Sequence, residues 1–265
     1  MAKFDYDIGV IGGGAGGLTV TSGAAQLGAK TLLIEKEDKL GGDCLHFGCV
    51  PSKTLIKSSH VYHWMKNSKK FGLPFLEIPP VEFRAISRRI KSVIDTIQQH
   101  DSKERFCKLG AQVEFGLPAF KDEHSIGVNG TTYSAKNWVI ATGSSPISPP
   151  IRGLDKTPFI TNKEIFYLDH LPKSMIVLGG GPIGIEMAQA FCRLGTKISV
   201  VDMAPQILVK EDPDMADAVK DVLSKEGVDF YLNSSIKETT DFGQEKEVKV
   251  NTPNGSNISL RADTI

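Results

Sequence analysis

The chain has 265 residues, a length that favours two domains over one minimal domain or three. With 40% hydrophobic residues, 23% charged residues and 26 glycines, its composition excludes disordered, collagen-like and disulfide-stapled proteins. The 31 Lys and Arg residues balance the 31 Asp and Glu residues, so the net charge favours neither nucleic acid nor an anionic membrane as a partner. Apolar runs are short, and Met1–Asp7 lacks the basic and apolar regions of a signal peptide, which predicts a cytoplasmic protein without membrane spans.

Two glycine-rich segments repeat one pattern of strand, turn and helix. The first follows the apolar segment Ile8–Ile11, the second follows Ile176–Leu178, and each has the spacing GxGxxG. A helical stretch comes next, and then a second apolar strand that ends at an acidic residue, Glu35 or Asp202. The third glycine and the acidic residue are 18 positions apart in both copies, which are offset by 167 residues. The glycines are Gly12, Gly14 and Gly17 in the first copy and Gly179, Gly181 and Gly184 in the second.

This repeat is typical of dinucleotide-binding βαβ units. The first glycine permits a tight turn, the second lets backbone N–H groups approach a pyrophosphate, and the third allows close packing of helix on strand. The helix N-terminus favours the phosphate charge, and Glu35 or Asp202 can accept hydrogen bonds from a ribose hydroxyl. One copy of GxGxxG is weak evidence for a dinucleotide-binding unit, because glycine-rich turns are common. Two copies in register predict an α/β protein with two Rossmann-like domains built on parallel sheets.

The region between the copies has a different pattern. Apolar residues recur at helical spacing through 81–109, which predicts one long amphipathic helix. The segments 112–120, 125–128 and 131–133, with a turn at Asn129-Gly130, predict a small antiparallel insertion.

A further apolar strand is expected over 137–143, before the Ser- and Pro-rich segment 144–150. This segment predicts a boundary between a first domain, 1–147, and a second, 148–265. The elements expected after it are a helix over 214–226, a strand over 228–232 and a hairpin with arms 247–251 and 257–260. The chain stops at Ile265 in what resembles the start of another strand, so the second domain is expected to be incomplete.

Cys44 and Cys49 lie five positions apart. Pro51 and Ser52 suit the first turn of a helix, so Cys49 is expected near a helix N-terminus, where a thiolate is favoured. A helix that begins between the cysteines can bring their Cα atoms within the range of about 4.4–6.8 Å that a disulfide requires. In a cytosolic protein such a close pair is more often catalytic or metal-binding than structural.

Zinc is the main alternative for this pair. A structural zinc site needs four ligands, usually as two close pairs, but the other cysteines, Cys107 and Cys192, are isolated in helical segments. His46, His60 and His63 could contribute, although the last two lie in an amphipathic segment. The spacing therefore favours redox chemistry and no metal site. These histidines are also the candidates for a general base near the cysteines, His46 first.

The segment Gly41–Lys53, GGDCLHFGCVPSK, resembles a known redox motif, GGTCxNxGCxPSK. That motif is found in the flavin-dependent pyridine nucleotide-disulfide oxidoreductases, the family of dihydrolipoamide dehydrogenase, glutathione reductase and mercuric reductase. Asp43 replaces threonine and His46 replaces asparagine, while the other motif residues match. The order of first GxGxxG, cysteine pair, Ala141-Thr142-Gly143 turn and second GxGxxG is also the family's order, so the resemblance covers essentially the whole chain.

The resemblance implies an FAD enzyme that transfers electrons between NAD(H) and a disulfide or dithiol through a Cys44–Cys49 disulfide. Cys49 would lie against the flavin as the charge-transfer thiolate, and Cys44 would exchange with the substrate. Lys53 would lie near the flavin N5 and pair with Glu186, two charges that would otherwise be ordinary solvated side chains. FAD is expected in the first copy and NAD(H) in the second. The other positions that the resemblance assigns to the FAD site are Gly42, Thr142 and Gly143.

NAD is favoured over NADP because Asp202 would repel a 2′-phosphate and Met203–Gln206 offers no arginine. The substrate is expected to be a small-molecule or protein-bound disulfide or dithiol, as for dihydrolipoamide dehydrogenase. A mercuric reductase-like enzyme and a non-catalytic nucleotide-binding fragment are the alternatives. The family's base and dimer interface belong to a C-terminal dimerisation domain that these residues are expected to lack. The full-length protein would then be a homodimer, and the 265-residue chain poorly active.

Overall fold

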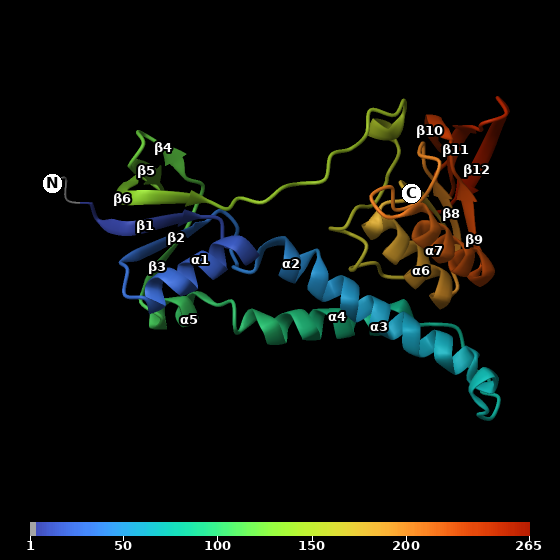
Figure 1. Ribbon diagram of the computed structural model, residues 1–265, viewed down its shortest axis with the longest axis horizontal. Helices are drawn as coiled ribbons and strands as arrows, with labels where there is room; N and C mark the ends of the chain where they lie inside the picture. Colours follow the sequence, from blue (N-terminus) through green and yellow to red (C-terminus); the bar gives the residue numbers. More distant parts are fainter. Residues whose placement is uncertain (1–3) are drawn as a thin grey trace. The chain divides into compact units, whose positions relative to one another are not determined.

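The computed structural model describes residues 4–265 (Figure 1); the first three residues, part of the stretch considered for a signal peptide, lie outside the described residues. The proximity of Cα atoms divides the chain into two units. The first unit contains Met1–Pro51 and Ile90–Pro146, and the second contains Ser52–Arg89 and Ile147–Ile265. Ser52–Arg89 thus groups with the second unit, whereas the sequence alone assigns it to the first domain.

The first unit is built on a six-stranded sheet in the order β3-β2-β1-β6-β5-β4. Strands β1, β2, β3 and the second half of β6 are parallel, and β4 and β5 extend the sheet antiparallel to the start of β6. The strands are β1 (Tyr6–Ile11), β2 (Thr31–Glu35), β3 (Ala111–Phe115), β4 (Ala119–Phe120), β5 (Ser125–Val128) and β6 (Thr131–Ile140). The helices that lie wholly in this unit are α1 (Ala15–Gln26), α2 (Gly42–His46) and α5 (Lys103–Lys108).

Strand β2 forms the centre of the first core, since it is buried at every position. A parallel strand covered on both faces is a continuous apolar run, as Leu32, Leu33 and Ile34 are here. One face packs with α1 and α5 through the cluster Val10, Leu18, Leu33, Leu40, Phe106 and Val113. The other face packs under β5 and β6 through the cluster Tyr6, Leu32, Ile34, Ile126, Val128 and Ala135.

Three expectations for the region between the glycine-rich copies are wrong. The helix expected over 81–109 is two helices, α4 (Phe83–Gln98) and α5, because the Ser102 side chain caps a new helix by accepting the Arg105 backbone N–H at 3.3 Å. Strand β3 joins the parallel sheet beside β2 and not the antiparallel insertion. The two strands expected over 131–133 and 137–143 are one strand, β6, which changes partner along its length.

The second unit contains two three-stranded sheets, in the orders β7-β8-β9 and β10-β11-β12. The first is parallel, with β7 (Ser174–Leu178), β8 (Lys197–Val201) and β9 (Val228–Tyr231). The second is antiparallel, with β10 (Ser235–Asp241), β11 (Lys246–Asn251) and β12 (Asn257–Ala262). The helices are α6 (Pro182–Leu194), α7 (Pro213–Glu226) and the short 3-10 turns η1 (Ser68–Phe71) and η2 (Leu154–Lys156). Apolar side chains from both sheets, including Ile176, Val201, Val248 and Val250, fill the space between them.

Two helices of the Ser52–Arg89 segment contact α6 within the second unit. Helix α3 (Cys49–Lys66) pairs with it through Lys53 and Glu186, and α4 through Phe83, whose ring stacks on Phe191 at a centroid distance of 5.5 Å. The structure confirms a mixed α/β fold dominated by parallel strands. Across the described part of the chain, no helix combines the length and apolar character needed to span a membrane.

Candidate redox and nucleotide-binding sites

The first glycine-rich loop connects β1 directly to α1. Gly12 has a φ of 107°, a left-handed conformation that suits glycine, and a Cβ there would collide with the Ala141 carbonyl. Gly17 leaves no space for a side chain either, because it lies against the Gly12 carbonyl. Helix α1 therefore begins beside the carboxyl end of β1, with Gly14 as its N-cap and no side chain over its first N–H groups. Such a helix end suits an anionic phosphate.

The Glu35 carboxylate is fixed beside this loop. One oxygen accepts the Gly13 N–H at 2.6 Å, and the other accepts the Glu37 N–H at 2.9 Å. Glu35 is buried at the end of β2, so its position at the loop is set by the sheet. This is the place from which a carboxylate can accept a ribose hydroxyl.

The second glycine-rich loop has the same construction. Gly179 has a φ of 106°, and Gly184 lies against the Gly179 carbonyl. The Asp202 carboxylate accepts the Gly180 N–H at 2.6 Å and the Ala204 N–H at 2.8 Å. The repeat found in the sequence is therefore also a repeat in hydrogen bonding. The sequence pattern predicted the two acidic positions but not their bonds to the loop N–H groups.

A narrow cradle of glycine backbone lies between the first loop and the segment before the cysteines. Gly41 and Gly42 have φ values of 114° and 59°, and the Gly41 N–H donates to the Gly13 carbonyl at 2.8 Å. A Cβ on Gly42 would lie 2.5 Å from the Gly14 Cα, so only glycine fits. The close approach of two backbone segments and the lack of side chains fit the pyrophosphate of a dinucleotide such as FAD.

The turn after β6 lies at the same edge of the sheet. The Ala141 N–H donates to the Ile11 carbonyl at 2.8 Å, which holds the start of this turn against the end of β1. Gly143, the residue after Thr142, has a φ of 69°, a left-handed conformation that suits glycine. The structure thus brings the Thr142-Gly143 turn to the glycine loop of the first unit.

The two cysteines of the motif are neighbours in the structure. Cys44 lies in α2, and Cys49 is the first residue of α3. Their side chains are in hydrogen-bonding contact, but they are not joined, so the structure contains the dithiol and not the expected disulfide. Burial raises the pKa of the Cys44 thiol, and the neighbouring Cys49 and Asp43 raise it further.

Lys53 lies one turn after Cys49 on α3, and its Nζ is 2.6 Å from Glu186 Oε1 on α6. Both side chains remain partly accessible, at 61% and 43% of their surface. The salt bridge joins the helix that follows the cysteines to the helix that follows the second glycine-rich loop.

The three histidines suggested as a base lie in different surroundings. His46 Nε2 is 3.0 Å from the Leu40 carbonyl, a contact that sequence reasoning missed because no pattern indicates it. His60 and His63, on α3, lie near Arg193 of α6, and burial followed by this guanidinium lowers the pKa of both. Within residues 4–265, no group of three or more His, Cys, Asp or Glu side chains is arranged to hold a metal ion.

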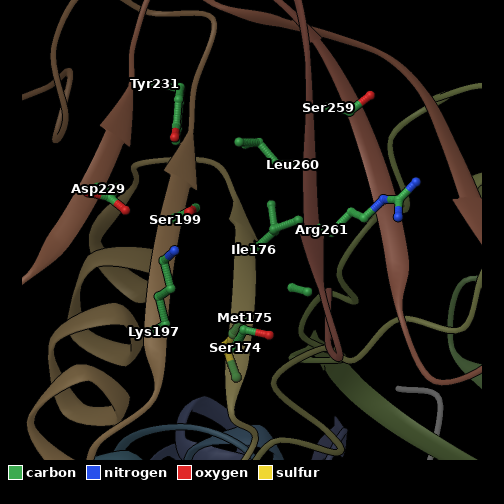
Figure 2. A pocket seen from close by; sticks show the side chains of 11 residues that line it. Ser174, Met175, Ile176, Lys197, Ser199, Asp229, Tyr231, Ser259, Leu260 and Arg261 are labelled. Carbon is green, nitrogen blue, oxygen red and sulfur yellow. The ribbon is translucent and has the colours of Figure 1, made fainter.

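A pocket of about 200 Å³ lies elsewhere in the second unit (Figure 2). Ser174 and Lys197, in its lining, are the first residues of β7 and β8, and Arg261 of β12 lines the opposite side. The pocket therefore lies along one face of β7, β8 and β9, from the start of β7 to Tyr231 at the end of β9. Nucleotides bind at the glycine-rich loop that follows the first strand of such a sheet, and none of the lining residues belongs to that loop, so this pocket is not the nucleotide site.

Comparison with known proteins supports the family resemblance that the cysteine motif indicates. The family model of the pyridine nucleotide-disulphide oxidoreductases matches residues 6–265. The dihydrolipoyl dehydrogenase of Acholeplasma laidlawii is 35% identical over 91% of this chain and 72% of its own length. The mitochondrial dihydrolipoyl dehydrogenase of Schizosaccharomyces pombe is 33% identical over 98% of this chain and 52% of its own. A mercuric reductase of Lysinibacillus sphaericus is 30% identical over 98% of this chain and 47% of its own.

Among solved structures, the HOCl-induced flavoprotein disulfide reductase RclA from Escherichia coli superposes with a TM-score of 0.82 at 27% identity. The match covers 98% of this chain and 55% of RclA. The chain spans about half the length of most of these relatives. The family expected from the cysteine motif is confirmed: the chain belongs to the pyridine nucleotide-disulphide oxidoreductases.

Proposed function

We propose that the protein transfers electrons between NAD(H) and a disulfide or dithiol substrate, with FAD bound by the first unit, as a dihydrolipoyl dehydrogenase-like enzyme. The observation that supports this most is the contact of the Cys44 and Cys49 thiols directly after the Gly41-Gly42 turn. The same turn forms one wall of the glycine cradle. A dithiol that can close to a disulfide thus adjoins a site that fits a dinucleotide.

FAD, when bound, would supply two-electron transfer between the nicotinamide and the dithiol. The chain's own residues would bind the cofactor and orient the reacting groups. The glycine loop N–H groups would hold the phosphates and Glu35 the ribose, while Lys53 is kept in place by Glu186. Closing the Cys44–Cys49 disulfide forms one S–S bond and releases two electrons and two protons, and opening it consumes them.

Protonation of the Cys44 thiol is expected to slow its exchange with a disulfide. Burial holds its pKa above the ordinary value, and the neighbours that act on it, Cys49 and Asp43, are not cations. Thiol–disulfide exchange needs the thiolate. We therefore expect slow thiol–disulfide exchange at Cys44 in the 265-residue chain at neutral pH.

NAD(H) is proposed for the second unit. Asp202 is fixed at the second loop by Gly180 and Ala204, in the position that binds a ribose diol and repels a 2′-phosphate. The loop residues Met203–Gln206 contain no cation that could offset this repulsion.

A soft metal ion is the second candidate substrate. Relatives include mercuric reductases, and one solved structure is a Cu(II) complex of RclA. Thiolate ligands select soft metal ions, and Cys44 and Cys49 are close enough to bind one ion together.

The experiment is anaerobic titration of the full chain with NADH in the presence of FAD. Cys44 and Cys49 are first oxidised, and mass spectrometry of peptides then measures their thiols. NADH should open the disulfide in the wild type, whereas Cys44→Ser and Cys49→Ser form none. Cys107→Ser, at an exposed cysteine of α5, is the matched control and should behave as the wild type.

A disulfide that survives NADH and FAD would contradict the proposed oxidoreductase function and favour a non-catalytic nucleotide-binding fragment. Parallel reactions with lipoamide, glutathione disulfide, Hg²⁺ and Cu²⁺ would identify the acceptor class by the rate at which each reoxidises the dithiol.

A further inference from the structure

The imidazole of His46 is anchored to the backbone before the cysteines. It is the last residue of α2, partly buried, and its Nε2 lies 3.0 Å from the Leu40 carbonyl oxygen. A carbonyl oxygen only accepts, so Nε2 must hold the hydrogen of this bond. This bond fixes the orientation of the ring and assigns one hydrogen to Nε2.

The Leu40 carbonyl accepts a second side chain. Gln98, the last residue of α4, donates its Nε2 to the same oxygen at 3.0 Å and to the Asp101 carbonyl at 3.0 Å. Leu40 itself is only 1% exposed. Its carbonyl is therefore held on one side by α2 and on the other by α4.

The two residues after Leu40, Gly41 and Gly42, have no side chains that could fix their backbone. Gly41 and Gly42 both have positive φ, and two adjacent glycines have little conformational stiffness of their own. This turn packs on Gly14 of the first loop, and Cys44 follows two residues later. An anchor at Leu40 thus limits the freedom of the cradle and of Cys44 together.

We propose that His46 is a positioning residue of the redox pair, which fixes the Gly41-Gly42 turn through the Leu40 carbonyl and does not exchange protons with the thiols. The proposal rests on the proposed role of the Cys44–Cys49 dithiol. It assigns a task to a residue that departs from the asparagine of the resembling family.

Electrostatic neighbours agree with this assignment. Cys49 and Asp43 act on Cys44, whereas His46 acts on the carboxyl of Asp101, whose pKa burial raises. The imidazole thus lies near Asp101, with its Nε2 already bonded to Leu40. Its Nε2 therefore supports the backbone that precedes the motif.

The test compares His46→Ala, which removes the donor, with His46→Gln, whose amide can reach the same carbonyl but does not titrate. His100→Ala, at an exposed histidine of the same unit, is the matched control. The first measurement is the equilibrium between the Cys44–Cys49 dithiol and disulfide in glutathione buffers, read by peptide mass spectrometry. The second is the pH profile of iodoacetamide alkylation at Cys44.

His46→Ala is expected to lower the equilibrium constant for disulfide formation about fivefold, the effect of one hydrogen bond. His46→Gln should stay within about twofold of the wild type, and His100→Ala should not change it. The midpoint of the alkylation profile should be the same in all four proteins. Gln98→Met removes the other donor to Leu40 and should lower the same constant, which keeps the test available if His46→Ala does not fold.

Two results would overturn the proposal. An unchanged constant in both His46→Ala and Gln98→Met would show that the anchor does not position the dithiol. A loss in His46→Gln as large as in His46→Ala, with a shifted alkylation profile, would show that the ring transfers protons. Failure of NADH to open the wild-type disulfide would count against the proposed function alone, since the glutathione equilibrium needs neither FAD nor NADH.

Discussion

Asp43 precedes Cys44 directly and stands where the resembling family has threonine. Burial raises the pKa of the Cys44 thiol most, the Cys49 side chain raises it further and the Cys49 backbone lowers it; the Asp43 carboxylate makes a smaller contribution that also disfavours the thiolate. The reactivity of Cys44, a residue that defines the redox motif, is thus reduced by Asp43, a residue that departs from the motif.

Asp43→Asn is therefore expected to increase the reactivity of Cys44. Because a raised pKa keeps the thiol protonated up to higher pH, removal of one negative charge should move the alkylation profile of Cys44 to lower pH. Peptide mass spectrometry after iodoacetamide pulses at several pH values measures this. Asp38→Asn, at an exposed carboxylate before the motif, is the control. An unchanged midpoint in Asp43→Asn would show that burial and Cys49 alone determine the pKa.

Asp202 provides the second prediction at this scale. Its carboxylate is already held by two backbone N–H groups, so it meets a ribose without rearranging. Asp202→Ala should weaken NADH binding about tenfold to a hundredfold, the range of a charge-assisted hydrogen bond, and NADPH binding less. Calorimetry with both nucleotides measures the two losses. Asp229→Ala, at a pocket-lining residue near the start of β9, should change neither, and equal losses for Asp202→Ala would contradict its role in selectivity.

At the scale of elements, α3 contacts α6 and α7 through charged and titratable groups. Arg193 and Glu226 form a paired contact at 2.6 and 2.8 Å, and both side chains are 13% exposed. His60 and His63 lie beside this pair, with Lys57 and Lys70 as the other cations that act on them. Burial and Arg193 lower the pKa of both histidines, which therefore pack in the neutral form.

The packing of α3, with His60 and His63, against α6 and α7 should weaken in mild acid. The histidine pKa is lower in the folded state than the unfolded value of about 6.5, so the unfolded chain binds more protons on acidification. The stabilisation is complete above that value and is lost as the pH falls through the folded pKa. Urea unfolding at several pH values should show a smaller decrease between neutral and acid pH for His63→Gln than for the wild type. His170→Gln, at an exposed histidine of the same unit, should retain the full decrease, and an identical slope in His63→Gln would contradict the assignment.

The elements also show how far the sequence could predict this fold. The order and type of the strand–turn–helix–strand units around both glycine-rich loops follow from local periodicity and from glycines that each loop requires, and the sequence predicts them with ends that differ by up to three residues. Strand β3 was assigned to the wrong sheet because its pairing with β2 depends on a partner about 80 positions away. Strand β10, SIKETTD, was missed because charged and threonine residues mask its weak apolar pattern. At the redox site, the motif predicts the pair of cysteines, but no sequence pattern indicates the hydrogen bond from His46 to Leu40.

For the whole molecule, the two nucleotide-binding loops are copies that differ in sequence and agree in geometry. In the first, Gly17 lies against the Gly12 carbonyl, and in the second, Gly184 lies against the Gly179 carbonyl. A carboxylate at the end of the next strand accepts a loop N–H at 2.6 Å in both. Each copy has its own sheet, so each is expected to bind its nucleotide separately.

Gly17→Ala and Gly184→Ala test this separation. A Cβ at either position would overlap a carbonyl oxygen and push the helix N-terminus away from the loop, so each change should weaken the nucleotide of its own unit more than about tenfold. Gly17→Ala should affect FAD and spare NADH, and Gly184→Ala should do the reverse, as fluorescence titration of each ligand measures. Gly23→Ala, on an open face of α1, has nothing within 4 Å of the added Cβ and should leave both affinities unchanged. If either glycine variant lowered both affinities equally, the two sites would be one cooperative structure, and the assignment of one nucleotide to each unit would be wrong.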